Sequence, residues 1–228
     1  MSIYKIPVFL FCMILLSHCA QEQQEQKTIS KELHQPNKSP MYSLEDYLAE
    51  NADLDHYVDS IYNTLDEKAL VAQLIMPAVG RYGQTLETIN GLIKDQLIGG
   101  ILMLNGTKEE FTDWIKDFNQ SNIKYGNLPF LYSADAEPSL VNRKIIGTAS
   151  VKKANEIDSI QEVMAVANTI SQDLNQIGIN YNFSPVVDMS PNTTVGFRSF
   201  GKNPENIIPW SDAFIKATQE NNIIATAK

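Results

Sequence analysis

Two hydrophobic patterns alternate along the chain: stretches in which apolar residues recur every three or four positions, and short runs that are apolar throughout. The first pattern is typical of amphipathic helices, because one face of a helix returns to the core about every 3.6 residues. It predicts helices over residues 54–70, 86–93, 107–118 and 158–176, and a further helix that begins after residue 203.

Polar motifs mark the ends of these predicted helices. Residues 64–67 (Thr-Leu-Asp-Glu) and 107–110 (Thr-Lys-Glu-Glu) match capping boxes, which begin helices. Asn203 followed by Pro204 matches an N-cap with proline at the first helical position. Gly178 is the expected stop of the long helix before it.

The short apolar runs predict buried strands over residues 73–78, 98–104, 130–134, 179–187 and 223–227. Each strand is followed by a helical stretch while chain remains, which indicates parallel βα units. Periodicity alone leaves two α/β architectures open, a barrel and an open doubly wound sheet. In both, functional side chains gather at the carboxyl ends of the strands.

The first nineteen residues indicate export. Lys5 precedes the apolar run 6–16, which is too short to span a bilayer and fits the hydrophobic region of a signal peptide. The run ends at Cys19 in a motif that resembles a bacterial lipobox, so we expect Cys19 to be lipidated. A plain secretory signal and a retained membrane anchor are the alternatives.

Residues 20–43 are rich in Gln, Glu and Lys without an apolar period, and they predict a flexible polar tether. The folded domain is expected over 44–228. We therefore expect an exported bacterial lipoprotein in the periplasm or on the outer surface, with a lipid anchor as its only contact with the membrane.

Composition excludes several classes of function. Eighteen basic residues against 27 acidic ones give a net charge of −9, which argues against a nucleic-acid partner. Both cysteines lie in or at the edge of the first apolar run, and the three histidines are His18, His34 and His56. Beyond residue 56 the chain therefore offers neither a Ser-His-Asp triad nor a His-ligated metal, and we expect no metal or cofactor.

Charged residues follow the predicted strands at their carboxyl ends. These residues are Asp135, Glu137, Arg143, Asp188, Arg198 and Lys228. Carboxylates that accept hydroxyl hydrogen bonds, beside guanidinium groups that donate in a fixed plane, suit a polyhydroxylated ligand such as a sugar. The alternative is structural: Asp135 and Arg143 would form an ion pair, and Asp188 would cap its loop.

Five sequence motifs occur along the chain in the same order as in a known protein family. They are Leu-Asp-Glu-Lys at 65–68 with Gln-Leu at 73–74, Ile-Gly-Gly-Ile at 98–101, Asp-x-Glu at 135–137, the run from 174 to Asp188, and Arg-Ser-Phe-Gly at 198–201 with Asn-Pro-Glu at 203–205. Together they resemble the N-terminal barrel domain of family 3 glycoside hydrolases, and most closely its bacterial β-N-acetylglucosaminidases, or β-N-acetylhexosaminidases. The resemblance covers residues 60–228 and implies the N-terminal part of a (β/α)8 TIM-type barrel with about five βα units.

The resemblance also implies roles for individual residues. Asp135 corresponds to an aspartate that holds sugar hydroxyls, and Arg143 and Arg198 correspond to arginines of the sugar site. Lys228 corresponds to the lysine of the family's Lys-His motif, which touches substrate. Glu137 is expected either to touch the ligand or to brace its loop.

One departure from the family concerns this same loop. Pro138 and Ser139 stand where the family usually has two glycines, and proline forbids the positive φ that glycine permits. We therefore expect the loop that carries Asp135 and Glu137 to follow a different path from that of the family.

Retaining hydrolysis of a glycosidic bond needs a nucleophile and a proton donor. In the family these are an aspartate, and in this branch a His-Asp pair, downstream of the Lys-His motif, so no catalytic residue is expected within residues 1–228. We therefore expect a fragment, inactive alone, of a longer enzyme that removes terminal non-reducing β-linked N-acetylhexosamine with retention, in carbohydrate metabolism or peptidoglycan turnover. The alternatives are a β-glucosidase of the same family and a non-catalytic sugar-binding surface lipoprotein.

Overall fold

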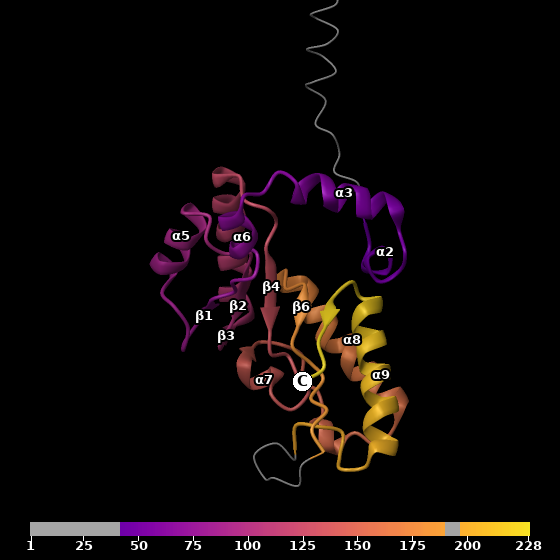
Figure 1. Ribbon diagram of the computed structural model, residues 1–228. Coiled ribbons are helices and arrows are strands. Elements are labelled where there is room, and N and C mark those ends of the chain that lie inside the picture. Colours follow the sequence, from indigo (N-terminus) through magenta and orange to yellow (C-terminus); the bar gives the residue numbers. More distant parts are fainter. Residues whose placement is uncertain (1–41, 190–196) are drawn as a thin grey trace, which may run out of the picture. The chain divides into compact units, whose positions relative to one another are not determined.

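The computed structural model describes residues 42–189 and 197–228 (Figure 1). The predicted signal peptide, Cys19 and the tether up to residue 41 lie outside the described residues. Ser43, the last residue of the predicted tether, is the N-cap of the first described helix. Among the described helices, none is both long enough and apolar enough to cross a bilayer.

Helices and strands alternate along the described chain. The helices are α2 (Leu44–Leu48), α3 (Ala52–Tyr62), α4 (Glu67–Ala72), α5 (Leu86–Lys94), α6 (Lys108–Tyr125), α7 (Val141–Lys144), the 3-10 helix η1 (Ala154–Glu156), α8 (Ile160–Ile177) and α9 (Pro204–Glu220). The strands are β1 (Ala78–Val79), β2 (Gly100–Met103), β3 (Gly106–Thr107), β4 (Leu131–Ala134), β5 (Ile145–Ile146), β6 (Tyr181–Asn182) and β7 (Ile224–Ala225).

The main sheet is parallel and has five strands in the order β1-β2-β4-β6-β7, and β3 and β5 form a separate parallel pair. In the register of the main sheet, Ala78 pairs with Leu102, Leu102 with Ser133, and Ser133 with Tyr181. Each strand therefore lies beside the one that precedes it in this sheet, and all carboxyl ends meet at one edge.

The helices that connect these strands form one continuous layer, because α5 packs on α6, α6 on α8, and α8 on α9. A doubly wound sheet reverses its strand order at a switch point and places helices on both faces. The uninterrupted strand order and the single helical layer instead match consecutive units of a (β/α)8 barrel, so the structure decides between the two architectures that periodicity left open.

The core lies between the sheet and this helical layer. Strand residues that face the helices are fully buried, among them Ile101, Met103 and Tyr132. The amphipathic helix predicted over 107–118 buries Phe111 and Phe118, which are 0% and 1% exposed. In β4 only the first residue, Leu131, is exposed, at 37%, and the three residues after it are buried.

Most of the predicted helix ends are confirmed. Thr107 and Glu110 form the expected capping box of α6, and Asn203 accepts a hydrogen bond from Glu205 N at the start of α9. Helix α8 ends at Gly178, whose φ of 96° lies in the left-handed region that glycine favours.

The capping box predicted at 64–67 is wrong. Asp66 is the N-cap of α4, and its carboxylate accepts a hydrogen bond from Ala69 N, whereas the Thr64 hydroxyl donates to Ile61 O. Both residue types can cap a helix, and Asp66, two positions later, takes the role.

All five predicted strands are present, and each is shorter than predicted. At 73–78 only Ala78 belongs to β1, and Leu74 is 85% exposed. The run 179–187 contributes only Tyr181 and Asn182 to a strand. The apolar composition of these segments located the strands. The length of a strand is defined by backbone pairing with its neighbours, which composition does not reveal.

Candidate functional site

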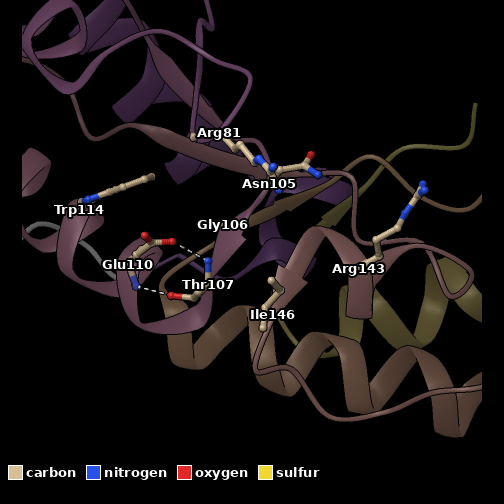
Figure 2. A pocket seen from close by; sticks show the side chains of 9 residues that line it. Arg81, Asn105, Gly106, Thr107, Glu110, Trp114, Arg143 and Ile146 are labelled. Atoms are coloured by element: carbon tan, nitrogen blue, oxygen red, sulfur yellow. Dashed lines mark hydrogen bonds between the residues drawn. The ribbon is translucent and has the colours of Figure 1, made fainter.

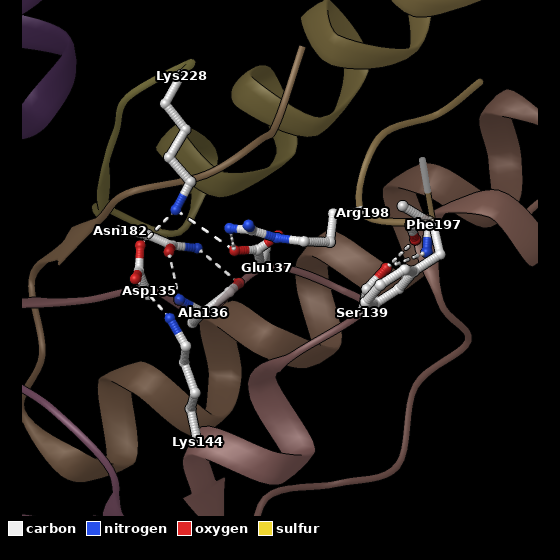
Figure 3. Close-up of polar contacts among 10 residues, drawn as sticks. Asp135, Ala136, Glu137, Ser139, Lys144, Asn182, Phe197, Arg198 and Lys228 are labelled. Carbon is white, nitrogen blue, oxygen red and sulfur yellow. Dashed lines mark hydrogen bonds and ion pairs between the residues drawn. The ribbon is translucent and has the colours of Figure 1, made fainter. Parts of the chain in front are cut away.

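A group of five charged side chains lies at the carboxyl edge of the sheet, after β4, β6 and β7 (Figure 3). We call it the charge cluster, and its members are Asp135, Glu137, Lys144, Arg198 and Lys228. Four of the five were expected at the site from sequence, and Lys144 was not. The cluster contains three cations and two carboxylates, in a chain whose net charge is −9.

Asp135 follows β4 directly, and a different lysine occupies each oxygen of its carboxylate. Lys144 Nζ lies 2.5 Å from Oδ2, and Lys228 Nζ donates to Oδ1. Both oxygens keep a further lone pair with which to accept a hydroxyl hydrogen bond. The structural alternative was an ion pair between Asp135 and Arg143. The structure contradicts it, because two lysines bind Asp135 instead.

The electrostatics of the cluster keep Asp135 ionised. Burial by itself raises the pKa of Asp135, but the hydrogen bonds and charges of Lys144 and Lys228 outweigh burial and hold the pKa below its ordinary value of 3.8. At neutral pH the side chain is therefore a fixed acceptor for hydrogen-bond donors of a ligand.

Glu137 is completely buried and braces the loop that carries Asp135. Arg198 binds it through two hydrogen bonds, Nε to Oε2 at 2.9 Å and an Nη2 contact to Oε1 at 2.6 Å. Lys228 Nζ lies 3.4 Å from the same Oε1. The hydrogen bonds to Glu137 raise the pKa of Arg198, and the charge of Asp188 contributes. Of the two roles left open for Glu137, this geometry favours bracing.

Backbone contacts place the two cations that reach the cluster from the far end of the chain. Lys228 donates its backbone N–H to Pro185 O at 3.0 Å, and its carbonyl accepts from Val187 N at 2.8 Å. A parallel bridge between Val186 and Ser199 brings Arg198 to the same edge. The segment after β6 therefore anchors both residues.

Two side chains whose contacts sequence reasoning missed fix the loop after β4. The fully buried Asn182 accepts a hydrogen bond from Ala136 N at 3.0 Å and donates to Ala136 O at 3.1 Å. Ser139 donates to Phe197 O at 2.5 Å and accepts from Ala154 N. Pro138 and Ser139 do not take positive φ, and the serine ties the loop to the segment that leads into Arg198.

Arg143 does not contact the charge cluster. It lines a neighbouring pocket of about 480 Å³ after β1 and β2, with Arg81, Asn105, Glu110 and Trp114 (Figure 2). We call this the arginine pocket. Helix α7 connects the two places, because Arg143 lines the pocket while the next residue, Lys144, binds Asp135.

The cluster supplies a fixed carboxylate and positively charged donors around one point, an arrangement that can hold several hydroxyl groups at once. Glu137 is completely buried and paired with Arg198 and Lys228, so a ligand cannot reach its carboxylate. In the part of the chain that the structure describes, no group of three or more His, Cys, Asp or Glu side chains is placed to hold a metal ion.

Comparison with known proteins gives a consistent result. Residues 64–228 match the glycosyl hydrolase family 3 N-terminal domain. Beta-hexosaminidase LpqI of Mycobacterium tuberculosis is 24% identical over 171 residues, which cover 72% of this chain and 42% of that protein. Beta-hexosaminidase of Glaesserella parasuis is 25% identical over 144 residues, which cover 60% of this chain and 41% of that protein.

Among solved structures, a glycoside hydrolase family 3 beta-N-acetylglucosaminidase from Paenibacillus superposes with a TM-score of 0.64 at 25% identity, covering 72% of this chain and 33% of that one. The chain thus spans less than half the length of each of these relatives.

Proposed function

Because this chain belongs to glycosyl hydrolase family 3, we propose that the complete protein hydrolyses the bond of a terminal, non-reducing β-linked N-acetylhexosamine with retention of configuration. This chain supplies the residues that hold the sugar. The nucleophile and the acid/base group come from residues beyond 228.

One observation carries the proposal: Asp135 is held ionised at the carboxyl edge of the sheet by Lys144 and Lys228, beside the Glu137–Arg198 pair. Catalytic and binding groups of barrel enzymes lie at this edge. A carboxylate that keeps lone pairs free while its charge is balanced can accept sugar hydroxyls without a large desolvation cost. Its two lysine partners also fix its position before the sugar arrives.

The choice of sugar has separate support. The curated relatives named above are β-hexosaminidases, and the Paenibacillus structure is that of a β-N-acetylglucosaminidase. These names favour an N-acetylhexosamine over glucose.

The test is hydrolysis of 4-nitrophenyl N-acetyl-β-D-glucosaminide and 4-nitrophenyl β-D-glucoside by the complete protein. We expect the first substrate to be preferred, with the β-anomer of the sugar as the first product seen by NMR. In Asp135→Asn, kcat/KM should fall about 100-fold, the effect of losing charge-assisted hydrogen bonds worth about 2–3 kcal/mol.

Asp212→Asn is the matched control, because Asp212 is an exposed aspartate of α9 that pairs with Lys216 four residues on. We expect its kcat/KM to remain within about twofold of wild type, as for most surface changes. Unchanged kinetics in Asp135→Asn would disprove the site. Preference for the glucoside would establish the β-glucosidase alternative, and sugar binding without hydrolysis would establish a binding lipoprotein.

We also propose that the protein is exported and anchored through a lipid on Cys19. In the native bacterium, Cys19→Ala should abolish incorporation of labelled palmitate and release the protein from the membrane fraction. Retention of the label in Cys19→Ala would refute lipidation at this residue.

A further inference from the structure

A nearly buried ion pair that lies outside the charge cluster joins two long helices. Lys108 is the first residue of α6 and Asp173 belongs to α8. Lys108 Nζ lies 2.6 Å from Asp173 Oδ1, and the two side chains are 22% and 9% exposed. Because a buried carboxylate is costly unless its oxygens are paired, the second partner of Asp173 is informative.

The carboxylate of Asp173 also holds the loop that follows β5. Ala149 N donates to Oδ2 at 2.7 Å, while Lys108 Nζ donates to Oδ1. Lys108 donates in addition to Gln176 Oε1 at 2.6 Å, so two side chains of α8 bind the lysine. The loop at Ala149 is therefore fastened to α8 directly, and to α6 through Lys108.

Ala149 connects this anchorage to α7. Its carbonyl accepts a hydrogen bond from the side-chain amide of Asn142 at 2.6 Å. Asn142 lies within α7, two residues before Lys144, whose Nζ lies 2.5 Å from Asp135 Oδ2 (Figure 3). A continuous chain of contacts thus runs from the buried carboxylate of Asp173 to the carboxylate of Asp135.

Helix α7 depends on such support. It has four residues and no side-chain hydrogen bond at its N-cap, and helices this short are not stable alone. It is followed directly by β5, which pairs with β3, the strand that leads into Lys108. The two contacts that hold α7, one through β5 and one through Asn142, therefore both lead back to the Lys108–Asp173 pair.

We propose that Asp173 is a positioning residue of the sugar site: through Ala149 and α7 it holds Lys144 against Asp135, and so fixes the direction in which the Asp135 oxygens face the sugar. This inference rests on the proposed function. A group that must meet a bound substrate loses much of its effect when it is misplaced by about 1 Å. If the pair only joined α6 to α8, its loss would reduce stability and leave Asp135 unchanged.

The first readout is the ionisation of Asp135 in the complete protein, followed by ¹³C NMR of its carboxyl carbon and assigned by the loss of the signal in Asp135→Asn. Burial raises the pKa of Asp135, and Lys144 and Lys228 together bring it below its ordinary value. The other charged groups of the cluster are Arg198 and Glu137, which bind each other.

We expect Asp173→Asn to raise the pKa of Asp135, because Lys144 is no longer held in place while Lys228 stays. Lys144→Met should raise the same pKa, since it removes one of the two lysines. The double variant should raise it no further than Lys144→Met alone, because two changes on one route are not additive.

The second readout is hydrolysis of 4-nitrophenyl N-acetyl-β-D-glucosaminide by the complete protein. In Asp173→Asn, kcat/KM per folded molecule should fall about tenfold. This loss should be absent when Lys144→Met is already present, because the contact through which Asp173 acts has then been removed.

Two controls separate positioning from stability. Ile93→Val shortens a fully buried side chain of α5, so it should lower the unfolding midpoint but leave kcat/KM and the pKa of Asp135 unchanged. Asp212→Asn removes the acid of an exposed ion pair on α9 and should change neither of these two readouts.

Asn142→Ala tests the same route if Asp173→Asn does not fold, because Asn142 is exposed and its loss leaves Asp173 paired with Lys108. It should raise the pKa of Asp135 as well. An unchanged pKa of Asp135 in Asn142→Ala, or in folded Asp173→Asn, would overturn the proposal. A raised pKa in a protein that hydrolyses neither nitrophenyl glycoside would support the positioning role and overturn the proposed function alone.

Discussion

The two halves of the sheet's carboxyl edge differ in whether their charged side chains are paired with one another. In the charge cluster, Asp135 is paired with two lysines and Glu137 with Arg198 and Lys228. In the arginine pocket, by contrast, no ion pair engages either arginine within the described part of the chain. The cluster is organised by its own contacts before a ligand arrives, whereas the arginines of the pocket have no ion-pair partner among the described residues. Changes in the cluster should therefore reduce stability, and changes in the pocket should leave it almost unchanged.

The largest loss of stability is expected for Glu137→Gln. The substitution keeps the shape of a completely buried side chain but removes the charge that Arg198 and Lys228 neutralise. Breaking a buried pair on one side costs about 4 kcal/mol in the free energy of unfolding, measurable by urea denaturation of the complete protein. The exposed Glu220→Gln is the control and should stay within about 0.5 kcal/mol. A loss under about 1 kcal/mol for Glu137→Gln would show that the pair is not structural.

The next largest effect is expected for Asn182→Ala, which should lower the free energy of unfolding by about 2–3 kcal/mol. Both backbone polar groups of Ala136 would be buried without a hydrogen-bond partner. Asn90→Ala is the matched control, since Asn90 also donates to a backbone carbonyl but is exposed on α5. Equal unfolding midpoints for the two variants would contradict the role given to Asn182.

Lys144→Met should lower the free energy of unfolding by about 1.5 kcal/mol at pH 7, and this effect should depend on pH. The lysine lowers the pKa of Asp135, so its stabilisation is fully present above the ordinary pKa of 3.8 and is lost as the pH falls through the lowered pKa. Denaturation curves of wild type and variant should therefore converge as the pH drops below 3.8. A difference that persists undiminished in acid would mean that Lys144 acts through packing.

The smallest effect on stability is expected for Arg143→Gln, which should change the unfolding free energy by no more than about 0.5 kcal/mol. Its side chain is exposed at the pocket and forms no ion pair within residues 42–189 and 197–228. A loss comparable to that of Glu137→Gln in the same denaturation assay would erase the distinction between the two halves of the edge.

Sequence predicted the helices of this fold better than its strands. Caps such as Thr107 and Asn203 act within one turn, so the local sequence contains the whole signal. The strand expected at 73–78 overlaps β1 only at Ala78, because exposure depends on distant packing, and Leu74 is apolar yet 85% exposed. The alternation of βα units predicted parallel strands, and the family resemblance predicted the barrel, which the strand order and the single helical layer confirm.

The site was predictable in so far as parallel strands end at one edge, which brings Asp135, Arg198 and Lys228 together. Lys144 was missed because the four-residue α7 has no side-chain N-cap and too few residues to show a period. Asn182 did have a signal, since an amide inside an apolar strand must find a partner, but its partner at Ala136 is 46 positions away.

The short helix α7 gives these two sites a fixed spacing. It is four residues long, and its last two side chains serve different sites, Arg143 the pocket and Lys144 the cluster. Adjacent residues of one helical turn move together, so a displacement of α7 would disturb the pocket and the contact with Asp135 at the same time.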